Sequence, residues 1–220
     1  MKIFYINLQE RTDRKEYMEK MLTDLNLEYE RFDAVRVSPE VIKSKYKTFY
    51  DNCVPRFKKY INSKDEGVIK RGIGAFGCYM SHIKIHQIME EQNDSPYIIL
   101  EDDVIITQST LDELYIVMKE LKDDWDMIRS TWYSTSKLNK MKGVNFESKF
   151  AKNSSYVHHG YGGTHFTVFN DAKTIMNYLL DEHLFSIDAV YCTDRLNVYQ
   201  KKLDVNIYPF KSDIPKNEES

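Results

Sequence analysis

The sequence predicts an α/β fold, with helices on both faces of a mostly parallel β-sheet. Short apolar runs rich in aromatic and β-branched residues alternate with segments of helical periodicity along the chain. Of the 220 residues, 42% are hydrophobic and 30% are charged, which suffices for a large folded core. The sequence contains neither internal repeats nor low-complexity blocks. We therefore expect one domain over residues 1–210, followed by a polar tail over residues 211–220.

The N-terminal part begins with a predicted βαβ unit. Residues 2–8 are rich in aromatic and β-branched side chains, which is typical of a buried strand. From Arg11 to Leu25, apolar side chains recur at the spacing of one helical face. A second strand is predicted at Tyr29–Val35.

Residues 36–70 interrupt this alternation of strands and helices. We expect a long, mobile and irregular Lys-rich insertion there, with room for short helices. Nine basic residues and two prolines are spread along it without sustained periodicity. Long irregular segments in compact domains are often functional lids, and they are as often plain solvated excursions. Both interpretations remain open.

Regular structure is predicted again from residue 72 onward. A helix is expected at Ile73–Gln92, entered through three glycines: Gly72, Gly74 and Gly77. A buried strand follows at residues 97–100, and Thr110 with Glu113 forms a capping-box pattern that opens the next helix. The remaining expected elements are a strand at 125–131, a loop or hairpin at 134–160, a strand at 164–169, a helix N-capped by Asn170, a short helix at 187–199 and a strand at 203–208.

The bulk properties argue against nucleic acid as a partner, because 31 basic and 34 acidic residues give a net charge of −3. The apolar run at residues 2–8 is too short for a secretory signal, and no stretch of about 18 apolar residues occurs. Cys53, Cys78 and Cys192 show neither the CxxC spacing of a metal site nor a disulfide framework. We expect a cytoplasmic protein whose cysteines are packed or surface thiols.

The acidic run Glu101-Asp102-Asp103 directly follows the predicted strand at residues 97–100. Ligands of open parallel sheets bind beyond the carboxyl ends of the strands. Strand alternation places Glu101 and Asp103 on one side and Asp102 on the other. Two carboxylates on one side suit a hard cation such as Mn²⁺ or Mg²⁺, which would bridge a diphosphate. The alternative is that these acids only cap the next loop or pair with lysines.

Asn7, Arg11 and Arg14 follow the first predicted strand, at a junction that often binds nucleotides in parallel sheets. Arginines one helical turn apart can make bidentate contacts to phosphate. An arginine at a helix N-terminus also opposes the helix dipole, which favours an anionic ligand or an acidic partner. The sequence contains neither GxGxxG nor a P-loop. A solvated helix end remains the other interpretation.

Three further segments carry candidate residues. Ser81 and His82 lie in the helix entered through the glycines, with His86 one turn later, but HxxxH without a third acidic ligand is a weak indication of Zn²⁺. A lone helical histidine is more often structural. The Gly-rich loop at residues 158–164 could approach a sugar or phosphate, or simply turn. Asp188 could accept the proton of a hydroxyl group as a base, or could N-cap a short helix.

With these motifs laid out, the chain resembles glycosyltransferase family 25, which includes bacterial lipooligosaccharide galactosyltransferases and collagen galactosyltransferases. The resemblance covers most of the chain and rests on the order and spacing of several short motifs. These are residues 5–8 with 11–14, residues 74–82, residues 98–104, Gly163-Thr164, Ile187-Asp188 and Ser212-Asp213-Ile214.

The resemblance implies a GT-A-like, Rossmann-type fold, a UDP-sugar donor, a Mn²⁺-type metal (or Mg²⁺) and inversion at the anomeric carbon. The donor is typically UDP-galactose. Glu101 and Asp103 are assigned to the metal, and Asp188 is assigned as the catalytic base from its position. The residues assigned to donor binding are Asn7, Arg11, Arg14, Ser81, His82, Asp102, Gly163 and Thr164.

The expected acceptor is a hydroxyl group of a glycan or glycolipid, and a lipid-linked acceptor would bring the protein to a membrane surface. A hydroxylysine of a collagen-like protein is the alternative within the same chemistry. A catalytically silent family member that acts as a binding module belongs to a different class, as does a nuclease or phosphatase that uses the acidic run. The variable residues 36–70 could set the choice of acceptor. The sequence does not specify an oligomeric state.

Overall fold

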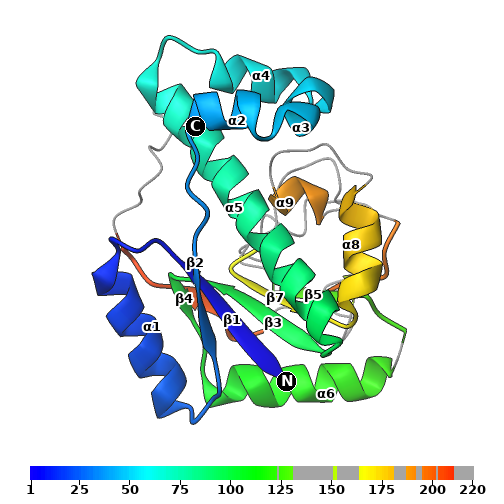
Figure 1. Ribbon diagram of the computed structural model, residues 1–220. Helices are drawn as coiled ribbons and strands as arrows, with labels where there is room; N and C mark the ends of the chain where they lie inside the picture. Colours follow the sequence, from blue (N-terminus) through cyan, green and yellow to red (C-terminus); the bar gives the residue numbers. More distant parts are fainter. Residues whose placement is uncertain are drawn as a thin grey trace.

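The computed structural model describes residues 1–122, 124–130, 151–152, 164–180, 187–191, 195–201 and 203–210. They form a layered α/β structure with helices on both faces of a central sheet (Figure 1). The predicted Gly163, the loop at residues 158–162, Cys192, the motif at residues 212–214 and the polar tail lie outside the described residues.

The central sheet has the strand order β2-β1-β3-β7-β5-β8-β6 in the described part of the chain. In that order the strands are Glu30–Asp33, Lys2–Asn7, Tyr97–Glu101, Phe166–Phe169, Met127–Ser130, Val198–Lys201 and Ala151–Lys152. Strands β2, β1, β3, β5 and β8 run in one direction, and β7 and β6 run in the other. The prediction of an α/β fold around a mostly parallel sheet is confirmed.

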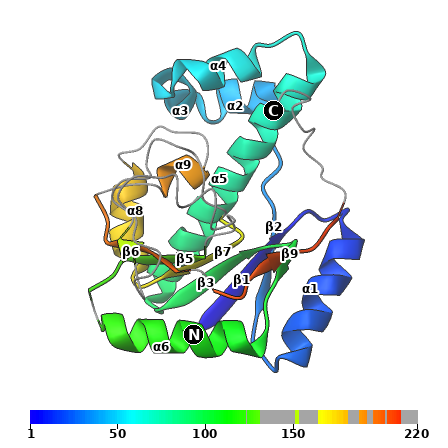
Figure 2. The ribbon, with the colours of Figure 1, turned by 180° about the vertical axis from the view of Figure 1, so that it is seen from behind.

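Strands β1 and β3 are buried on both faces because successive side chains alternate between two hydrophobic clusters. The side chains in the cluster with α5 (Glu66–Gln92) are Phe4, Ile6, Tyr97 and Ile99. Those in the cluster with α1 (Thr12–Asp24) and α6 (Gln108–Leu121) are Ile3, Tyr5, Ile98 and Leu100. The sheet therefore has an α5 face and an α1/α6 face, which are visible in Figure 2.

The remaining elements surround this sheet. They are α2 (Pro39–Ser44), α3 (Lys47–Asn52), α4 (Pro55–Ile61), α8 (Ala172–Leu180), α9 (Ile187–Val190), β4 (Val104–Ile105) and β9 (Asn206–Ile207). Strands β4 and β9 pair as a separate two-stranded antiparallel sheet. No helix among the described residues is both long enough and apolar enough to cross a membrane.

Short helices are present in residues 36–70, but the irregular character expected for this insertion is corrected, because α2, α3, α4 and the start of α5 occupy most of it. Ser38 caps α2 by accepting a hydrogen bond from the Val41 backbone N–H, and prolines stand at the beginnings of α2 and α4. Ile42, Phe57 and Ile61 are buried in the cluster with α5. These contacts hold helices that are too short to be stable alone.

Three predicted helix starts also differ from the structure. Helix α5 begins at Glu66 and runs through the three glycines, with Asp65 as its N-cap. Thr107 caps α6, with Thr110 at the third helical position of the capping box in place of Glu113. For α8, the Asp171 carboxylate accepts the Thr174 N–H at 2.6 Å, so Asp171 replaces Asn170 as the capping residue.

The C-terminal part departs most from the predicted elements. The short helix expected at residues 187–199 is limited to Ile187–Val190, and Val198 begins strand β8. This strand pairs in parallel with β5, so its residues are held by the sheet. Of the loop or hairpin expected at 134–160, only the two residues of β6 are described.

Candidate functional site

The acidic run lies where β3 ends, and strand alternation divides it between the two faces of the sheet. Glu101 continues the α5 face of Tyr97 and Ile99, so its carboxylate lies near α5. Asp102 is buried on the opposite side, against α1. The predicted separation of Glu101 from Asp102 is therefore present in the structure.

Asp102 is held by Arg14 and Asn7. Arg14 Nη1 lies 2.5 Å from Asp102 Oδ1, and Asn7 Nδ2 donates to Asp102 Oδ2 at 2.8 Å. The Asn7 carbonyl oxygen in turn accepts a hydrogen bond from Arg31 Nε at 3.0 Å. Burial raises the pKa of Asp102 and outweighs the opposing effects of Arg14 and Asn7. This cluster joins the ends of β1 and β3 to the first turn of α1.

Glu101 and Asp103 meet at His165, which immediately precedes β7. His165 Nδ1 lies 2.7 Å from Glu101 Oε2 and 3.2 Å from Asp103 Oδ1. Burial alone would lower the pKa of His165, but the two carboxylates outweigh it and raise the pKa to about 11. Burial would likewise raise the pKa of Glu101, but His165 and Thr164 lower it to about 2. The raised pKa favours the protonated form of His165 between the two carboxylates.

Thr164 joins this cluster to Asp188 at the start of α9. The Thr164 hydroxyl contacts Glu101 Oε1 and lies 3.2 Å from Asp188 Oδ1. The fully buried Arg129 of β5 places its Nη2 atom 4.0 Å from the same Asp188 oxygen. Burial and the nearby Glu101 raise the pKa of Asp188 to about 6. The structure therefore brings Asp188, Thr164 and Glu101 together, as their joint assignment to one site required.

Residues 203–210 cover the α1 side of this site. The Tyr208 backbone N–H donates to the Asp103 carbonyl oxygen at 2.7 Å. The Phe210 ring lies 5.3 Å from the Arg14 guanidinium and 5.9 Å from that of Arg11. Arg11 also makes a two-point contact with Asp13, at 2.9 and 2.8 Å. Both predicted arginines therefore lie near one another beneath an aromatic ring.

Ser81 and His82 lie deeper, in the buried middle of α5. The Ser81 hydroxyl accepts a hydrogen bond from the Val35 N–H and donates one to the Gly77 carbonyl, each at 2.8 Å. This joins α5 to the segment after β2. His82 Nδ1 lies 3.1 Å from the Tyr191 hydroxyl. Ser81 and His82 therefore make structural contacts within the protein, in addition to any contact with the sugar donor.

The HxxxH pair does not form a shared metal site. His86 Nδ1 lies 2.6 Å from the Tyr97 hydroxyl, and its Nε2 lies 2.5 Å from the Tyr191 hydroxyl. Both ring nitrogens of His86 are thus occupied by tyrosines. The weak indication of a zinc pair at His82 and His86 is therefore wrong.

Sequence reasoning missed His165 and Arg129. His165 is adjacent to the predicted Thr164, but its role depends on β7 pairing with β3, which brings the His165 carbonyl to the Glu101 N–H at 3.0 Å. Arg129 was detectable in principle, because an arginine inside an apolar strand requires a buried acidic or polar partner.

The site offers one oxygen-rich set of ligands for a cation. Glu101, Asp103 and His165 place one ligand atom each within 4.8 Å of the others. Two carboxylates with an imidazole fit Mn²⁺ or Mg²⁺, provided that His165 gives up its proton or moves aside. This set of ligand atoms therefore fits the expected Mn²⁺ or Mg²⁺ ion.

Comparison with known proteins shows which proteins this chain is similar to. Residues 1–184 match the model of glycosyltransferase family 25, described as an LPS biosynthesis protein. A protein of Acanthamoeba polyphaga mimivirus with a provisional glycosyltransferase name is 32% identical over 133 residues, 58% of this chain and 36% of that protein. Procollagen galactosyltransferase 1-A of Xenopus laevis is 29% identical over 129 residues, 57% of this chain and 20% of its own length.

A glycosyltransferase 25 family member of Drosophila melanogaster is 28% identical over 103 residues, covering 47% of this chain and 16% of the relative. The aligned region thus spans about a third or less of each of these curated relatives. It is shorter than the whole proteins that carry these names.

Proposed function

Because this chain belongs to glycosyltransferase family 25, we propose that it transfers a hexose, and specifically galactose, from a UDP-sugar to a hydroxyl acceptor with inversion. The observation that carries the proposal is the meeting of Glu101, Asp103 and Asp188 at the carboxyl edge of the sheet. Open α/β sheets bind their ligands at this edge. The galactosyltransferase names of two relatives support galactose as the sugar.

The nucleotide side of the donor is assigned to the α1 face. Arg11 and Arg14 lie near the acidic run and carry guanidinium groups that suit phosphate oxygens. Asn7 and Arg14 fix Asp102 in a single orientation. Its carboxylate can then accept a hydrogen bond from a hydroxyl group of the UDP-sugar, or hold the Arg14 guanidinium toward a phosphate group. Phe210 covers the two arginines and would limit the access of water to this side.

Glu101 and Asp103, assisted by His165, are the residues that would hold Mn²⁺ or Mg²⁺. Such an ion supplies positive charge to a diphosphate leaving group. The His165 imidazolium already compensates the two carboxylates in part in their present arrangement. A divalent cation in its place would neutralise both carboxylates, whereas the single charge of the imidazolium offsets only one of them.

Asp188 is proposed as the base that accepts the proton of the acceptor hydroxyl. Its pKa of about 6, raised by burial and by Glu101, is closer to neutrality than that of an ordinary aspartate. Thr164 and Arg129 orient its carboxylate from two directions. The carboxylate thus remains ionised at neutral pH while being a stronger base than usual.

The proposed acceptor is a hydroxyl group of a glycan or glycolipid of the lipopolysaccharide type, which agrees with the family's description. Hydroxylysine of a collagen-like protein is the alternative suggested by the names of the Xenopus laevis relatives. Helices α2, α3 and α4 carry exposed lysines beyond the N-terminal end of α5, and they are a candidate surface for selecting the acceptor.

The decisive experiment measures UDP release from UDP-galactose in the presence of Mn²⁺, for the wild type and for Asp103→Ala. We expect a loss of about hundredfold or more, because electrostatic stabilisation of the leaving group would be weakened. Asp24→Ala is the matched control, since Asp24 is an exposed aspartate that pairs only with Lys20 in the described residues. Equal turnover by Asp103→Ala and the wild type would remove the metal assignment.

A second candidate is a binding module that works without a metal. The position of His165 between Glu101 and Asp103 favours it, because a protonated imidazole there would take the place of a metal cation. Calorimetric titration of UDP with and without Mn²⁺ separates the two candidates. Mn²⁺-linked UDP binding supports the transferase, and UDP binding that is indifferent to Mn²⁺, together with no UDP release, supports the module.

A further inference from the structure

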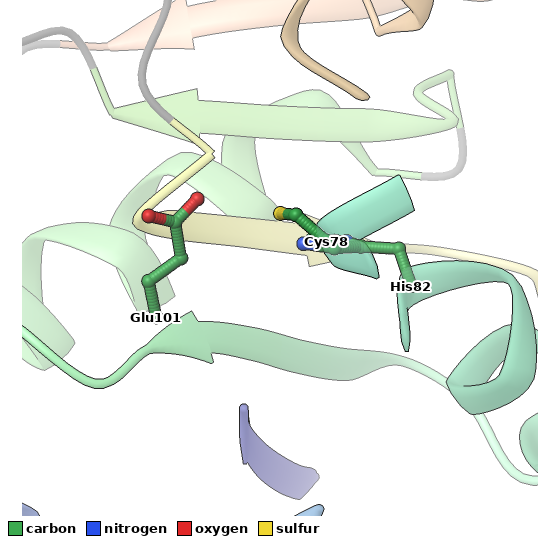
Figure 3. Close-up of side chains that lie close together, drawn as sticks. All are labelled: Cys78, His82 and Glu101. Carbon is green, nitrogen blue, oxygen red and sulfur yellow. The ribbon is translucent and has the colours of Figure 1, made fainter. Parts of the chain in front are cut away.

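A second group of metal-ligating side chains lies on the α5 face of the sheet. Cys78 and His82 are one helical turn apart on α5, so their side chains lie on the same face of that helix. Figure 3 shows both pointing toward Glu101 at the end of β3. The sulfur, one imidazole nitrogen and one carboxylate oxygen all lie within 4.8 Å of one another.

These separations are at most 4.8 Å, whereas the ligand atoms of a bound ion lie closer together. In a tetrahedral zinc site with bonds of about 2.0 to 2.3 Å, the ligand atoms lie roughly 3.5 Å apart. Rotation of the Cys78 and Glu101 side chains can supply the remaining movement, since neither is fully buried. The same partial exposure of Cys78 provides a route of entry for an ion.

His82 belongs to this group and has one ring nitrogen without a hydrogen-bond partner among the described residues. Its Nδ1 atom lies 3.1 Å from the Tyr191 hydroxyl, whereas Nε2 is buried and has no hydrogen-bond partner among the described residues. The whole side chain is fully buried. A buried polar atom without a partner is unusual in a folded protein and calls for an explanation.

The hydrogen bonds on the other side of the ring are the basis for assigning a tautomer to His82. We assign the Tyr191 hydroxyl as donor to His86 Nε2 and as acceptor from His82 Nδ1–H. His82 Nε2 then carries a lone pair, whereas the opposite tautomer would bury an N–H without an acceptor. A metal-binding histidine commonly donates its other N–H to a neighbouring oxygen in this way.

We propose that Cys78, His82 and Glu101 form a binding site for a thiophilic divalent cation, namely Zn²⁺. Sulfur and imidazole nitrogen favour Zn²⁺ over Mn²⁺ and Mg²⁺, which prefer oxygen ligands. A water molecule would complete a four-coordinate ion. Binding releases the proton of the Cys78 thiol to solvent, and the site does not require the proposed sugar transfer.

A nucleophilic role for Cys78 is the other chemistry to consider. Burial, followed by the charges of Glu101 and Asp188, raises the pKa of the Cys78 thiol well above its usual value. The thiol is therefore a poor nucleophile at neutral pH. A cation that replaces the thiol proton would relieve the repulsion between the resulting thiolate and the carboxylates.

Glu101 belongs to both groups of ligands, because its Oε2 atom also contacts His165. Zn²⁺ bound at Cys78 and His82 would compete for the carboxylate that the oxygen-rich set uses. If the proposed metal-linked donor binding occurs, Zn²⁺ is expected to oppose it. This consequence rests on the proposed function, while the binding site itself does not.

The test uses Co²⁺ as a visible substitute for Zn²⁺, added to the metal-free full chain without any nucleotide. We expect a sulfur-to-cobalt charge-transfer absorption that saturates at one Co²⁺ per chain and disappears when Zn²⁺, but not Mg²⁺, is added. Cys78→Ser should abolish this absorption, while the matched controls Cys53→Ser and Cys192→Ser should retain it. His82→Gln should weaken Co²⁺ binding by about tenfold or more.

Absence of the absorption in the wild type, or its survival in Cys78→Ser, would overturn the proposal. Because Cys78→Ser could also disturb folding, a measurement on the wild type accompanies it. Maleimide labelling followed by mass spectrometry of the cysteine peptides should show slower modification of Cys78 in the presence of Zn²⁺. An unchanged rate at Cys78 would contradict the proposal irrespective of any variant. Neither readout depends on UDP or sugar.

Discussion

Gly77 lies where α5 passes closest to the segment after β2. A methyl group on Gly77 would place its carbon 2.5 Å from the Val35 carbonyl oxygen, about 0.9 Å short of ordinary contact at 3.4 Å. The obstacle is backbone rather than the end of a flexible side chain. One turn later, the Ser81 hydroxyl accepts a hydrogen bond from the Val35 N–H at 2.8 Å. Gly77→Ala must therefore separate α5 from Val35 at a point where they are also hydrogen-bonded.

The expected cost combines three contributions. Overpacking of this kind costs about 1 to 3 kcal/mol. Weakening of the hydrogen bond between Val35 and Ser81 adds about 1 kcal/mol. The preference of a helix interior for alanine over glycine returns about 0.5 to 1 kcal/mol. We expect a net loss of roughly 2 kcal/mol in the free energy of unfolding, and a fall in Tm of roughly 4 to 8 °C.

Equilibrium unfolding in urea, followed by circular dichroism, measures this loss. Gly67→Ala is the matched control, because Gly67 lies in the first turn of α5 and its added carbon would meet only the end of the Asp65 side chain, at 3.2 Å. That variant should be as stable as the wild type or more stable by up to about 1 kcal/mol. If Gly77→Ala proved as stable as Gly67→Ala, the close approach of α5 to Val35 would be refuted.

Three further outcomes follow from buried polar groups. Tyr191→Phe should lower the free energy of unfolding by about 2 to 4 kcal/mol, because the two buried imidazoles of His82 and His86 lose their hydrogen-bond partner. The control Tyr115→Phe, at a side chain that is 69% exposed, should change it by less than about 0.5 kcal/mol. Urea unfolding measures both variants. Burial lowers the pKa of His82 to about 4, so the unfolded chain takes up a proton first as the pH falls below 6.5, and stability is lost from there down toward pH 4. At pH 5 the contribution of His82 to this loss should be about 2 kcal/mol relative to pH 7.5. His82→Gln should reduce the total loss of stability between the two pH values by about that amount, while the buried His86 still contributes to the remainder. If Asp188 is the base, the rate of UDP release should decrease as the pH falls through about 6, because burial and Glu101 raise the pKa of Asp188 to that value. Asp188→Asn should be nearly inactive at every pH. An unchanged rate of UDP release between pH 7.5 and 5 in the wild type would exclude that role.

The elements predicted correctly are those whose pattern is local. The βαβ unit of β1, α1 and β2 follows from residues that are neighbours in the sequence, and so does the division of Glu101 from Asp102. A period of two along a strand requires no knowledge of the partner strand. The mostly parallel sheet follows from the alternation of such patterns along the chain.

The features that were missed depend on contacts between distant residues. His165 meets Glu101 only because β7 inserts antiparallel between β3 and β5, and no local pattern specifies that order. Helices α2, α3 and α4 are stabilised by packing against α5, so the irregular appearance of their sequence misleads. Thr107 and Thr110 both satisfy the preferences of a helix cap, and the structure selects the earlier one.

The segment after residue 203 has a consequence for the comparison of relatives. The family match covers residues 1–184, yet β9 pairs with β4 and the Tyr208 N–H reaches the Asp103 carbonyl from beyond that region. Both contacts use backbone atoms, which every residue except proline can supply in full. The side chain at position 208 can therefore change without loss of the backbone contact to the acidic run, whereas Phe210 contacts Arg11 and Arg14 through its ring. In chimeras of related chains, we expect this closing strand to be the interchangeable part of the site.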